Sequence, residues 1–383
     1  MALEAHLPEV RVLNSYGDIS AADWDALVGE RSPFLEHTFL FGLEKFECAV
    51  PDAGWVPRPI TVWEGSRLIA AAPGWVKMHS MGEFVYDHSW ADAAKRAGFR
   101  YYPKLVVAVP FTPVTGDRLL IAPDVDARMA RGALLAGLKA ATEGCHGLHV
   151  LFNPEEEAEA LETAGGFTRI QFQFQWKNRN YNNFDDFLAQ FRSRHRKKIR
   201  RERREAGRLQ IERILNPSAE DVAAMHSFYR NTCSQFGHWG RVYLSEDFFA
   251  YLQKTWKDRL LFVLARDQGK VVAGAFNVVK GKRMYGRYWG CAEEVKFMHF
   301  ELCYYQTIEY CIEHGLEVFE PGHGGGHKYR RGFEPTITYS SHWLMDRRLH
   351  EGLKHHTVAE AEHVRRQAAA LTEQSPLKQA IEL

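Results

Sequence analysis

The alternation of apolar and polar positions predicts two β-hairpins, one in each half of the chain. In the first half, apolar runs at 60–63 and 68–72 flank a polar turn that contains Gly65. In the second half, apolar runs at 261–265 and 270–279 flank a short polar turn. Two apolar runs joined by a short polar turn are typical of an antiparallel hairpin. We therefore expect each half of the chain to contain such a pair of strands.

The two hairpins match each other when the sequence is shifted by 203 positions. Ile69 then falls on Val272, and Ala70 falls on Ala273. A repeat at a fixed offset is the usual trace of an internal duplication. Short alternating hairpins also resemble one another by chance, so the duplication is a hypothesis.

Further periodic segments follow each hairpin and alternate between strands and helices. After the first hairpin we expect strands at 105–110, 148–152 and 167–176, with helices at 127–142 and 154–164. After the second we expect strands at 283–289, 316–319 and 336–344, with helices at 297–314 and 349–374. Helices interspersed among mostly antiparallel strands predict an α+β fold, in which each half has a twisted mixed sheet with helices on its faces.

Composition limits the class of protein. Apolar residues make up 45% of the 383-residue chain, which is enough for a sizeable core and excludes a disordered protein. The six cysteines show no CxxC spacing, and no apolar run reaches the ~18 residues of a membrane-spanning helix. No signal-peptide pattern is visible at the start of the sequence. We therefore expect a cytoplasmic protein without a membrane span.

Charge is distributed unevenly along the chain. Lys and Arg total 49 and Asp and Glu total 48, which gives a net charge of +1. Residues 192–208 alone hold ten Lys and Arg against Glu202 and Glu205. We expect a strongly basic helix over 185–208 that joins two domains. The expected organisation is an N-terminal domain at 1–180, a basic linker helix at 181–208, a C-terminal domain with the active site at 209–348 and a C-terminal helix at 349–383.

The basic helix has two interpretations. Lys and Arg side chains on one helix neutralise phosphates and release counterions, which is how proteins bind nucleic acids without reading sequence. The alternative is a solvated linker helix. No helix-turn-helix, zinc-finger or RNA-recognition pattern is present. The nucleic-acid candidates are Arg196, Lys197, Lys198, Arg200 and Arg201.

The segment from Glu320 to Glu334 is the first candidate for chemistry. Its glycines let backbone N–H groups approach a ligand, and His327, Lys328 and Arg331 can move a proton or stabilise negative charge. Acyl transfer to an amine needs this combination, because the tetrahedral intermediate carries an oxyanion. The alternative is a mobile basic surface loop. A metal site at His323 and His327 is not expected, because no carboxylate or cysteine completes the ligand pattern.

Glu301 is the second candidate for catalysis. It falls on the apolar face of the helix predicted at 297–314, so its carboxylate must be paired or protonated inside the protein. It could orient a substrate amine, or it could form a structural ion pair with an arginine.

Aromatic and polar residues gather in both halves and are candidates to line a substrate cleft. Aromatic residues in strands are more often core, which is the alternative for each of them. The predicted substrate-binding residues are Asp87, His88, Trp90, Tyr101, Tyr102, Lys104, Phe111 and Thr112 in the first half, and Arg287, Tyr288, His299, Tyr304, Glu320, Tyr329 and Arg330 in the second.

These motifs together resemble the FemAB-like family of predicted acyltransferases, over most of the chain. The segments that carry the resemblance are 87–92 (DHSWAD), 101–105 (YYPKL), 111–116 (FTPVTG), 286–290 (GRYWG), 299–301 (HFE), 303–306 (CYYQ) and 327–333 (HKYRRGF). The family is similar to the Fem aminoacyl transferases, which have two GNAT-like domains and a helical arm. The resemblance therefore implies tandem GNAT-like domains, with the basic helix in the place of the arm.

Two departures from the Fem pattern stand out. The expected arm is one helix of about 24 residues rather than a long coiled coil. The glycine signature with which ordinary GNAT enzymes bind acetyl-CoA is absent ahead of Phe297. Acetyl-CoA binding at the second domain is therefore disfavoured.

The resemblance implies an N-acyltransferase that moves an activated acyl or aminoacyl group to an amine of a peptide-like or cell-wall-precursor substrate. The donor is either aminoacyl-tRNA or acyl-CoA, and no cofactor or metal is assigned. In this scheme Lys328, Arg330 and Arg331 stabilise phosphate or oxyanion charge, and His327 or Glu301 handles the proton. One alternative is an acyl-CoA-dependent GNAT acetyltransferase. Another is a non-catalytic protein that recognises peptidoglycan or RNA.

Overall fold

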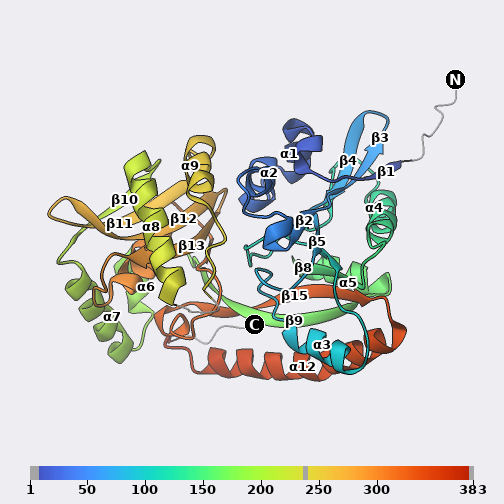
Figure 1. Ribbon diagram of the computed structural model, residues 1–383. Coiled ribbons are helices and arrows are strands. Elements are labelled where there is room, and N and C mark those ends of the chain that lie inside the picture. The colour runs from blue at the N-terminus through green and yellow to red at the C-terminus, as the bar shows by residue number, and fades with distance from the viewer. Residues whose placement is uncertain (1–7, 236–239, 379–383) are drawn as a thin grey trace. The chain divides into compact units, whose positions relative to one another are not determined.

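A computed structural model describes residues 8–235 and 240–378 of the chain (Figure 1). The contacts between residues divide the chain into two units. Unit 1 contains the chain up to Gln171 together with Thr338–Val364, and unit 2 contains Phe172–Ile337 and the chain from Arg365 on. Three elements pass from one unit into the other along the chain: β9 (Phe167–Lys177), β15 (Glu334–Leu344) and α12 (Arg347–Glu373).

Unit 1 contains two groups of strands. The first is an antiparallel sheet with the order β1-β3-β4-β7, formed by β1 (Glu9–Val12), β3 (Ile60–Glu64), β4 (Arg67–Ala72) and β7 (Leu120–Ile121). The second has the order β15-β8-β6-β5-β2, with β8 (Gly147–Asn153), β6 (Lys104–Val107), β5 (Gly74–Lys77) and β2 (Trp55–Pro57). In the second group β6 and β8 are parallel and the other pairs are antiparallel.

Helices cover the sheets of unit 1 through apolar faces. Leu134 and Leu138 of one of them are fully buried in a cluster with Ile60 and Val62. The helices of unit 1 are α1 (Ala21–Val28), α2 (His37–Lys45), α3 (His88–Arg96), α4 (Ala127–Ala141) and α5 (Glu155–Thr163), with 3-10 turns at Tyr16–Asp18, Pro33–Leu35 and Pro51–Ala53.

Unit 2 is built on a sheet with the order β10-β11-β12-β13-β14-β9. Neighbouring strands are antiparallel except β13 and β14, which are parallel. The strands are β10 (Gln210–Leu215), β11 (Leu260–Asp267), β12 (Lys270–Lys280), β13 (Arg283–Cys291) and β14 (Val318–Glu320). Helix α8 (Ala219–Gln235) lies across β12 and β13 in Figure 1.

The remaining helices of unit 2 include one irregular segment. The helix predicted at 297–314 contains a π-helical turn, which widens the backbone by one residue. The helices are α6 (Phe184–Ala189), α7 (Ser193–Ala206), α8 (Ala219–Gln235), α9 (Glu246–Thr255), α10 (Met298–Phe300), the π turn (Glu301–Tyr305), α11 (Gln306–Glu313) and a 3-10 turn at Tyr329–Arg331.

The two hairpins share an irregularity at equivalent positions. The register of β3 and β4 shifts between Val62 and Trp63, and the register of β11 and β12 shifts between Ala265 and Arg266. These positions correspond under the offset of 203 seen in the sequence. In both units a strand and two helices precede the hairpin, with the short strand β2 inserted before the hairpin in unit 1. In both, that strand pairs antiparallel with the first hairpin strand. A shared bulge is a specific feature, and it supports the predicted duplication.

The prediction of one continuous basic helix over 185–208 is wrong. The segment forms two helices, because the chain is extended at Arg192 and α7 begins only at Ser193. The break lets Phe191 turn inward, where its side chain is fully buried beside Phe187 and its backbone bridges to Leu377. Helix α7 therefore has 14 residues, with Ile199, Glu202 and Ala206 on its buried face.

The division into units runs differently from the expected boundaries at 180, 208 and 348. From Thr338 onward β15 belongs to unit 1, because it pairs with β8 there. Helix α7 belongs to unit 2, because its apolar residues are buried in the cores of that unit. Within the part of the chain that the structure describes, no helix is both long and apolar enough to cross a membrane.

Candidate functional site

A cavity of about 480 Å³ opens in unit 2 between two strands, the π turn and the glycine-rich loop. Six of the predicted site residues line it: His327, Lys328, Arg287, Tyr288, His299 and Tyr304. The rest of its lining consists of Ala275, Asn277, Gly286, Trp289, Cys303, Pro321, Gly322, His323, Gly324 and Gly325.

A bulge at the strand side of the cavity presents Arg287. Phe276 of β12 faces Tyr288 of β13, but the next residue, Asn277, faces Gly286, so Arg287 is the extra residue. A bulge bends its strand and redirects the side chain that it inserts. A Cβ atom on Gly286 would lie 3.3 Å from Cα of Pro321, so a side chain there would press on the loop.

Helix α10 and the π turn supply another wall, with His299 from α10 and with Cys303 and Tyr304 from the π turn. Burial raises the pKa of the Cys303 thiol well above its ordinary value, so Cys303 is present as a thiol rather than a thiolate. It therefore lacks the anionic form that a nucleophilic cysteine needs. Single-turn π segments are frequent at functional sites.

Tyr304 and His327 form the central polar pair of the cavity. The Tyr304 hydroxyl lies 2.9 Å from Nε2 of His327, and which atom donates depends on the imidazole tautomer. Burial, together with the charges of Arg331 and Lys328, lowers the pKa of His327 to about 4. Burial also raises the pKa of Tyr304. At neutral pH the pair is therefore an uncharged imidazole and a phenol, which can accept and relay a proton.

Lys328 places a cation beside this pair. Its side chain is buried, with Nζ donating to the carbonyl oxygen of Gly322 at 2.6 Å and to that of His323 at 3.4 Å. Burial lowers its pKa to about 8. The ammonium group is therefore mostly charged at pH 7 and titrates only slightly above it.

The loop between Pro321 and His327 follows a path that favours glycine. The φ angles of Gly322, Gly324 and Gly325 lie between 69° and 84°, a region that side chains other than glycine rarely adopt. Backbone N–H groups in such loops can converge on an anion. The contacts of Lys328 with two loop carbonyls hold the loop over the cavity.

Arg331 and Glu301, both predicted to be catalytic, lie outside the cavity lining. The Arg331 guanidinium contacts Glu202 and Tyr305 and donates to the carbonyl oxygen of His327 at 3.0 Å. Glu301 accepts from Arg203 at 3.2 Å, so the structure places it in the ion pair with an arginine that the sequence left as an alternative.

Three other predicted binding residues of this region also lie outside the lining. Glu320 is buried and accepts from Arg283 at 3.1 Å, and burial raises its pKa to about 7. The exposed Arg330 donates from Nε to the Tyr329 hydroxyl at 3.1 Å.

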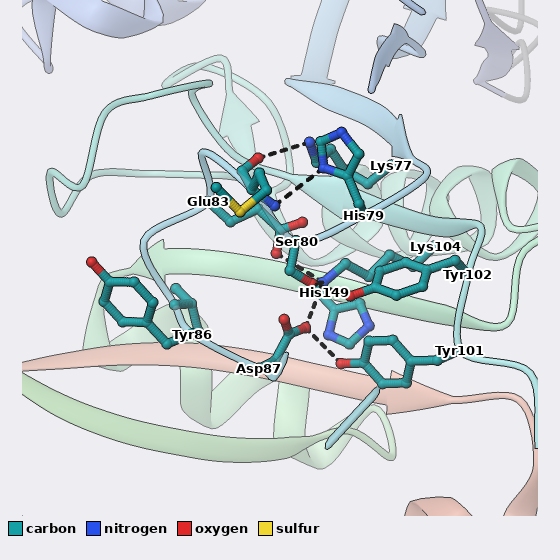
Figure 2. A network of polar contacts seen from close by, with 12 residues as sticks. Lys77, His79, Ser80, Glu83, Tyr86, Asp87, Tyr101, Tyr102, Lys104 and His149 are labelled. Atoms are coloured by element: carbon teal, nitrogen blue, oxygen red, sulfur yellow. Dashed lines mark hydrogen bonds and ion pairs between the residues drawn. The ribbon is translucent and has the colours of Figure 1, made fainter. Parts of the chain in front are cut away.

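Four of the eight predicted residues of the first half, Asp87, Tyr101, Tyr102 and Lys104, form a separate network in unit 1 (Figure 2). Lys104 is fully buried and donates to Asp87, to Glu83 at 2.8 Å and to Ser80 at 2.9 Å. Tyr101 donates to the same Asp87 oxygen at 2.6 Å. The lysine charge holds the pKa of Asp87 well below its usual range, although burial opposes this.

This network includes Tyr102, and it borders a histidine pair through Tyr101, whose ring centroid lies 5.8 Å from that of His149. The Tyr102 and Ser80 hydroxyls lie 2.6 Å apart. His149 and His342 face each other across β8 and β15, with their Nδ1 atoms 2.7 Å apart, and burial lowers the pKa of both. Asp87, Tyr101, Tyr102 and Lys104 are thus brought together by the structure, in a buried cluster rather than in a described cavity.

The other predicted residues of the first half are core or half-buried. Trp90 packs edge-on against His342, and Phe111 packs edge-on against Trp55. The Thr112 hydroxyl donates to the carbonyl oxygen of Pro110 at 2.9 Å, and His88 is half-buried at the start of α3. For Trp90 and Phe111 the structure places the rings in the core, as the alternative interpretation had it.

The nucleic-acid candidates lie on α7, most of them on its exposed side. Lys197 is exposed, as are Lys198, Arg200 and Arg201. Arg200 pairs with Asp185 at 3.1 Å, and Lys198 lies 3.9 Å from Glu202. Arg196 is half-buried and donates to the carbonyl oxygen of Phe191 at 3.4 Å.

Sequence reasoning missed Asn277, Cys303 and His323 as parts of the cavity wall. Asn277 is the only polar side chain between Val271 and Val279, and this interruption of the apolar run was a signal for it. Cys303 belongs to the motif at 303–306, but its side chain was not predicted to be part of a site. Among residues 8–235 and 240–378, no group of three His, Cys, Asp or Glu could hold a metal ion.

Comparison with known proteins gives the family and the fold. The sequence profile of the FemAB-like family, described as peptidoglycan biosynthesis/recognition, matches residues 15–379. No curated protein sequence matches the chain. The crystal structure of FemX superimposes with a TM-score of 0.53 at 12% identity, covering 90% of this chain and 100% of FemX.

Two further structures are similar at lower TM-scores. L-PGS from Bacillus licheniformis gives 0.47 at 11% identity, covering 92% of this chain and 98% of that one. A tandem GNAT protein from the clavulanic acid biosynthesis pathway gives 0.45 at 11% identity, covering 88% and 98%. The likeness to FemX concerns the fold alone. The predicted α+β fold, with mixed, mostly antiparallel sheets and helices on their faces, is confirmed.

Proposed function

We propose, from the premise that the chain belongs to the FemAB-like family of peptidoglycan biosynthesis or recognition, that it transfers an activated acyl or aminoacyl group to an amine. The predicted family is thus confirmed, and the chain is a transferase. The acceptor we propose is a peptide-like cell-wall precursor. The observation that carries the proposal is the Tyr304–His327 pair, 2.9 Å apart, beside the buried Lys328 in one cavity.

The chemistry of these groups fits attack by an amine on an ester or thioester. The amine nitrogen forms a bond to the carbonyl carbon, and the bond from that carbon to the leaving oxygen or sulfur breaks. Neutral His327 takes the proton that the nitrogen loses. The phenol of Tyr304 returns a proton to the leaving group. The Lys328 ammonium and loop N–H groups stabilise the oxyanion that forms between these steps.

An aminoacyl ester on RNA is the donor that we favour over acyl-CoA. Residues 292–297, which precede α10, include Glu293 and Glu294 and contain no glycine. The segment therefore lacks the glycines that let backbone N–H groups approach a pyrophosphate closely, and its two carboxylates outnumber its one cation, Lys296, which disfavours that anion. The exposed basic side of α7 offers phosphate contacts in the same unit. We place this reaction in the cytoplasm, where charged tRNA is available.

A donor–acceptor assay tests the proposal. The purified chain is incubated with total aminoacylated tRNA or with acetyl-CoA, together with a cell-wall precursor whose peptide carries a free amine. Mass spectrometry should detect a new amide that depends on charged tRNA and disappears when the amine is acetylated beforehand. If a product forms with acetyl-CoA but not with charged tRNA, the donor is an acyl-CoA instead of the aminoacyl ester that we favour. The absence of any product with either donor and a range of such amines would overturn the proposal.

A matched pair of variants connects the assay to the site. His327→Gln keeps a polar side chain of similar size but removes the base, so product formation should fall by about a hundredfold or more. His314→Gln changes an exposed histidine at the end of α11, outside the cavity lining, and should behave like the wild type.

A further inference from the structure

A chain of contacts runs from the basic helix α7 to the backbone of His327. It begins at Glu202, whose side chain is 1% exposed although it lies on the most basic helix of the described structure. Its Oε2 atom accepts hydrogen bonds from Nη2 of Arg331 at 2.9 Å and from the hydroxyl of Tyr305. A buried carboxylate is costly unless it is paired and hydrogen-bonded, so these two contacts hold Glu202 in place.

Arg331 carries the connection onward. Its Nε atom donates to the Tyr305 hydroxyl at 2.9 Å, and its Nη1 atom donates to the carbonyl oxygen of His327 at 3.0 Å. Its Cζ atom lies 3.4 Å from the centroid of the Phe300 ring. A planar guanidinium that is held on several sides has no freedom to turn. The position of the His327 carbonyl group is therefore tied to the position of Glu202.

The π turn holds the same loop segment at two points. Tyr304 contacts the His327 side chain, and the next residue, Tyr305, contacts Arg331. Consecutive residues of a helix point in different directions, so one tyrosine faces the cavity while the other is fully buried behind it. The segment from His327 to Arg331 is thus fixed through its first side chain and through its last.

We infer that Glu202 is a positioning residue for the transfer reaction: through Arg331 it fixes the backbone of His327, so that the imidazole stays against Tyr304 in the cavity. This inference rests on the proposed function. It makes α7 part of the active site, because the same helix that carries the basic surface also holds the catalytic loop. Glu205 provides a control on that helix, since its recorded ion pairs are with Arg201 and Lys296 instead.

Nuclear magnetic resonance of ¹⁵N-labelled histidine tests the inference without a substrate. The His327 signals are assigned by their loss in His327→Gln. In the wild type we expect one hydrogen-bonded tautomer that stays neutral until pH about 4, the pKa set by burial and by the nearby charges. In Glu202→Gln the loop should loosen and admit water. The titration midpoint should then rise by at least one pH unit, and the two tautomers should exchange. Glu205→Gln should match the wild type.

A second variant keeps the test decisive if Glu202→Gln does not fold. Tyr305→Phe preserves the buried ring and removes only the hydroxyl that joins Glu202 to Arg331. It should shift the His327 titration in the same direction by a smaller amount. A folded variant of either kind in which the tautomer and the midpoint of His327 equal those of the wild type would overturn the inference.

Kinetics separate this inference from the proposed function. With a working assay, Glu202→Gln should lower kcat at least tenfold and change KM less than twofold, because the cavity walls that bind substrate are retained. A raised KM with unchanged kcat would contradict a positioning role. If the wild type itself makes no product, the proposed function fails, and the histidine spectra still decide whether Glu202 positions His327.

Discussion

The Tyr304 hydroxyl and Nε2 of His327 lie 2.9 Å apart, and they join the π turn to the glycine-rich loop. Both groups are held uncharged at neutral pH, because burial lowers the pKa of the imidazole and raises the pKa of the phenol. A neutral base next to a protonated hydroxyl is a suitable arrangement for passing a proton. The pair therefore gives the most direct test of how the cavity works.

Removal of the Tyr304 hydroxyl should slow transfer. In Tyr304→Phe the ring that forms the cavity wall is retained but the proton relay is lost, so kcat should fall about tenfold to a hundredfold with little change in KM. The measurement is steady-state kinetics with a saturating donor. Tyr310→Phe is the control, because Tyr310 stacks on His314 at 3.8 Å outside the cavity lining. Equal loss in both variants would argue against the relay.

The dependence of transfer activity on pH should reflect the titration of Lys328. Burial lowers its pKa to about 8, so the oxyanion-stabilising charge is present below pH 8 and is lost as the pH rises through it. Activity should therefore decline above pH about 8. Lys328→Arg keeps its charge throughout the accessible range. Its activity can be lower overall, but the decline near pH 8 should disappear from the profile. A decline that persists unchanged in Lys328→Arg would assign it to another group.

Two neighbouring glycines offer a matched comparison. A Cβ atom on Gly325 would lie 3.0 Å from the His327 ring, and the φ of Gly325 is +84°. Gly325→Ala should therefore strain the loop by about 1–2 kcal/mol and push the imidazole away from Tyr304. A Cβ atom on Gly326 would meet nothing within 4 Å. Kinetics and thermal unfolding of Gly325→Ala and Gly326→Ala should thus differ, with activity lost in the first alone.

The buried network of unit 1 should make stability depend on pH. Burial raises the pKa of Glu83 from 4.5 to about 7. Between these values the folded state holds a proton that the unfolded chain has released, so this group's contribution to stability is lost as the pH rises. The loss amounts to at most about 3 kcal/mol. Urea unfolding at several pH values should show that the wild type loses stability relative to Glu83→Gln as the pH rises from 4.5 to 7, and this difference excludes the opposite contribution of the buried His149 and His342.

The control for this experiment is an exposed glutamate of the same unit. Glu64 is exposed at the end of β3, next to the hairpin turn. The variant Glu64→Gln should therefore leave the dependence of stability on pH unchanged. A difference in unfolding free energy between the wild type and Glu83→Gln that stays constant between pH 4.5 and 7 would contradict the role assigned to Glu83.

The fold was predictable from the sequence wherever local pattern decides structure. The two hairpins and most later strands lie where alternation placed them, and the offset of 203 even matches the bulges after Val62 and Ala265. The break at Arg192 was not predictable, because it depends on the burial of Phe191 in a core assembled from distant segments. The π turn was not predicted either, because one extra residue in a helical turn hardly changes which apolar residues lie on the buried face of the helix.

The candidate site was predictable in its residues and less so in their roles. The chemistry of His327 and Lys328 follows from their side chains and their glycine loop, so the sequence pointed to both. The position of Arg331 depends on Glu202, 129 residues away, whose burial the strongly basic pattern of α7 concealed. Contacts between such distant residues have no local signal in a single sequence.

The exposed side of α7 should bind RNA through charge alone. Arg194, Lys197 and Arg204 are exposed on this helix. Each phosphate contact contributes about 0.7–0.9 to the slope of log affinity against log salt. Changing all three residues to Gln should therefore make that slope less steep by about 2–3, and should weaken tRNA binding at low salt. Fluorescence anisotropy with labelled tRNA at several salt concentrations measures both quantities.

The matched control removes the same charge from another exposed helix surface. Lys354, Arg365 and Arg366 are exposed on α12, and their change to Gln should leave the salt slope as in the wild type. The two triple variants have equal net charge, so a difference between them assigns binding to α7 rather than to overall charge. Equal slopes in both variants would show that α7 is a solvated helix, and the tRNA would then need another surface.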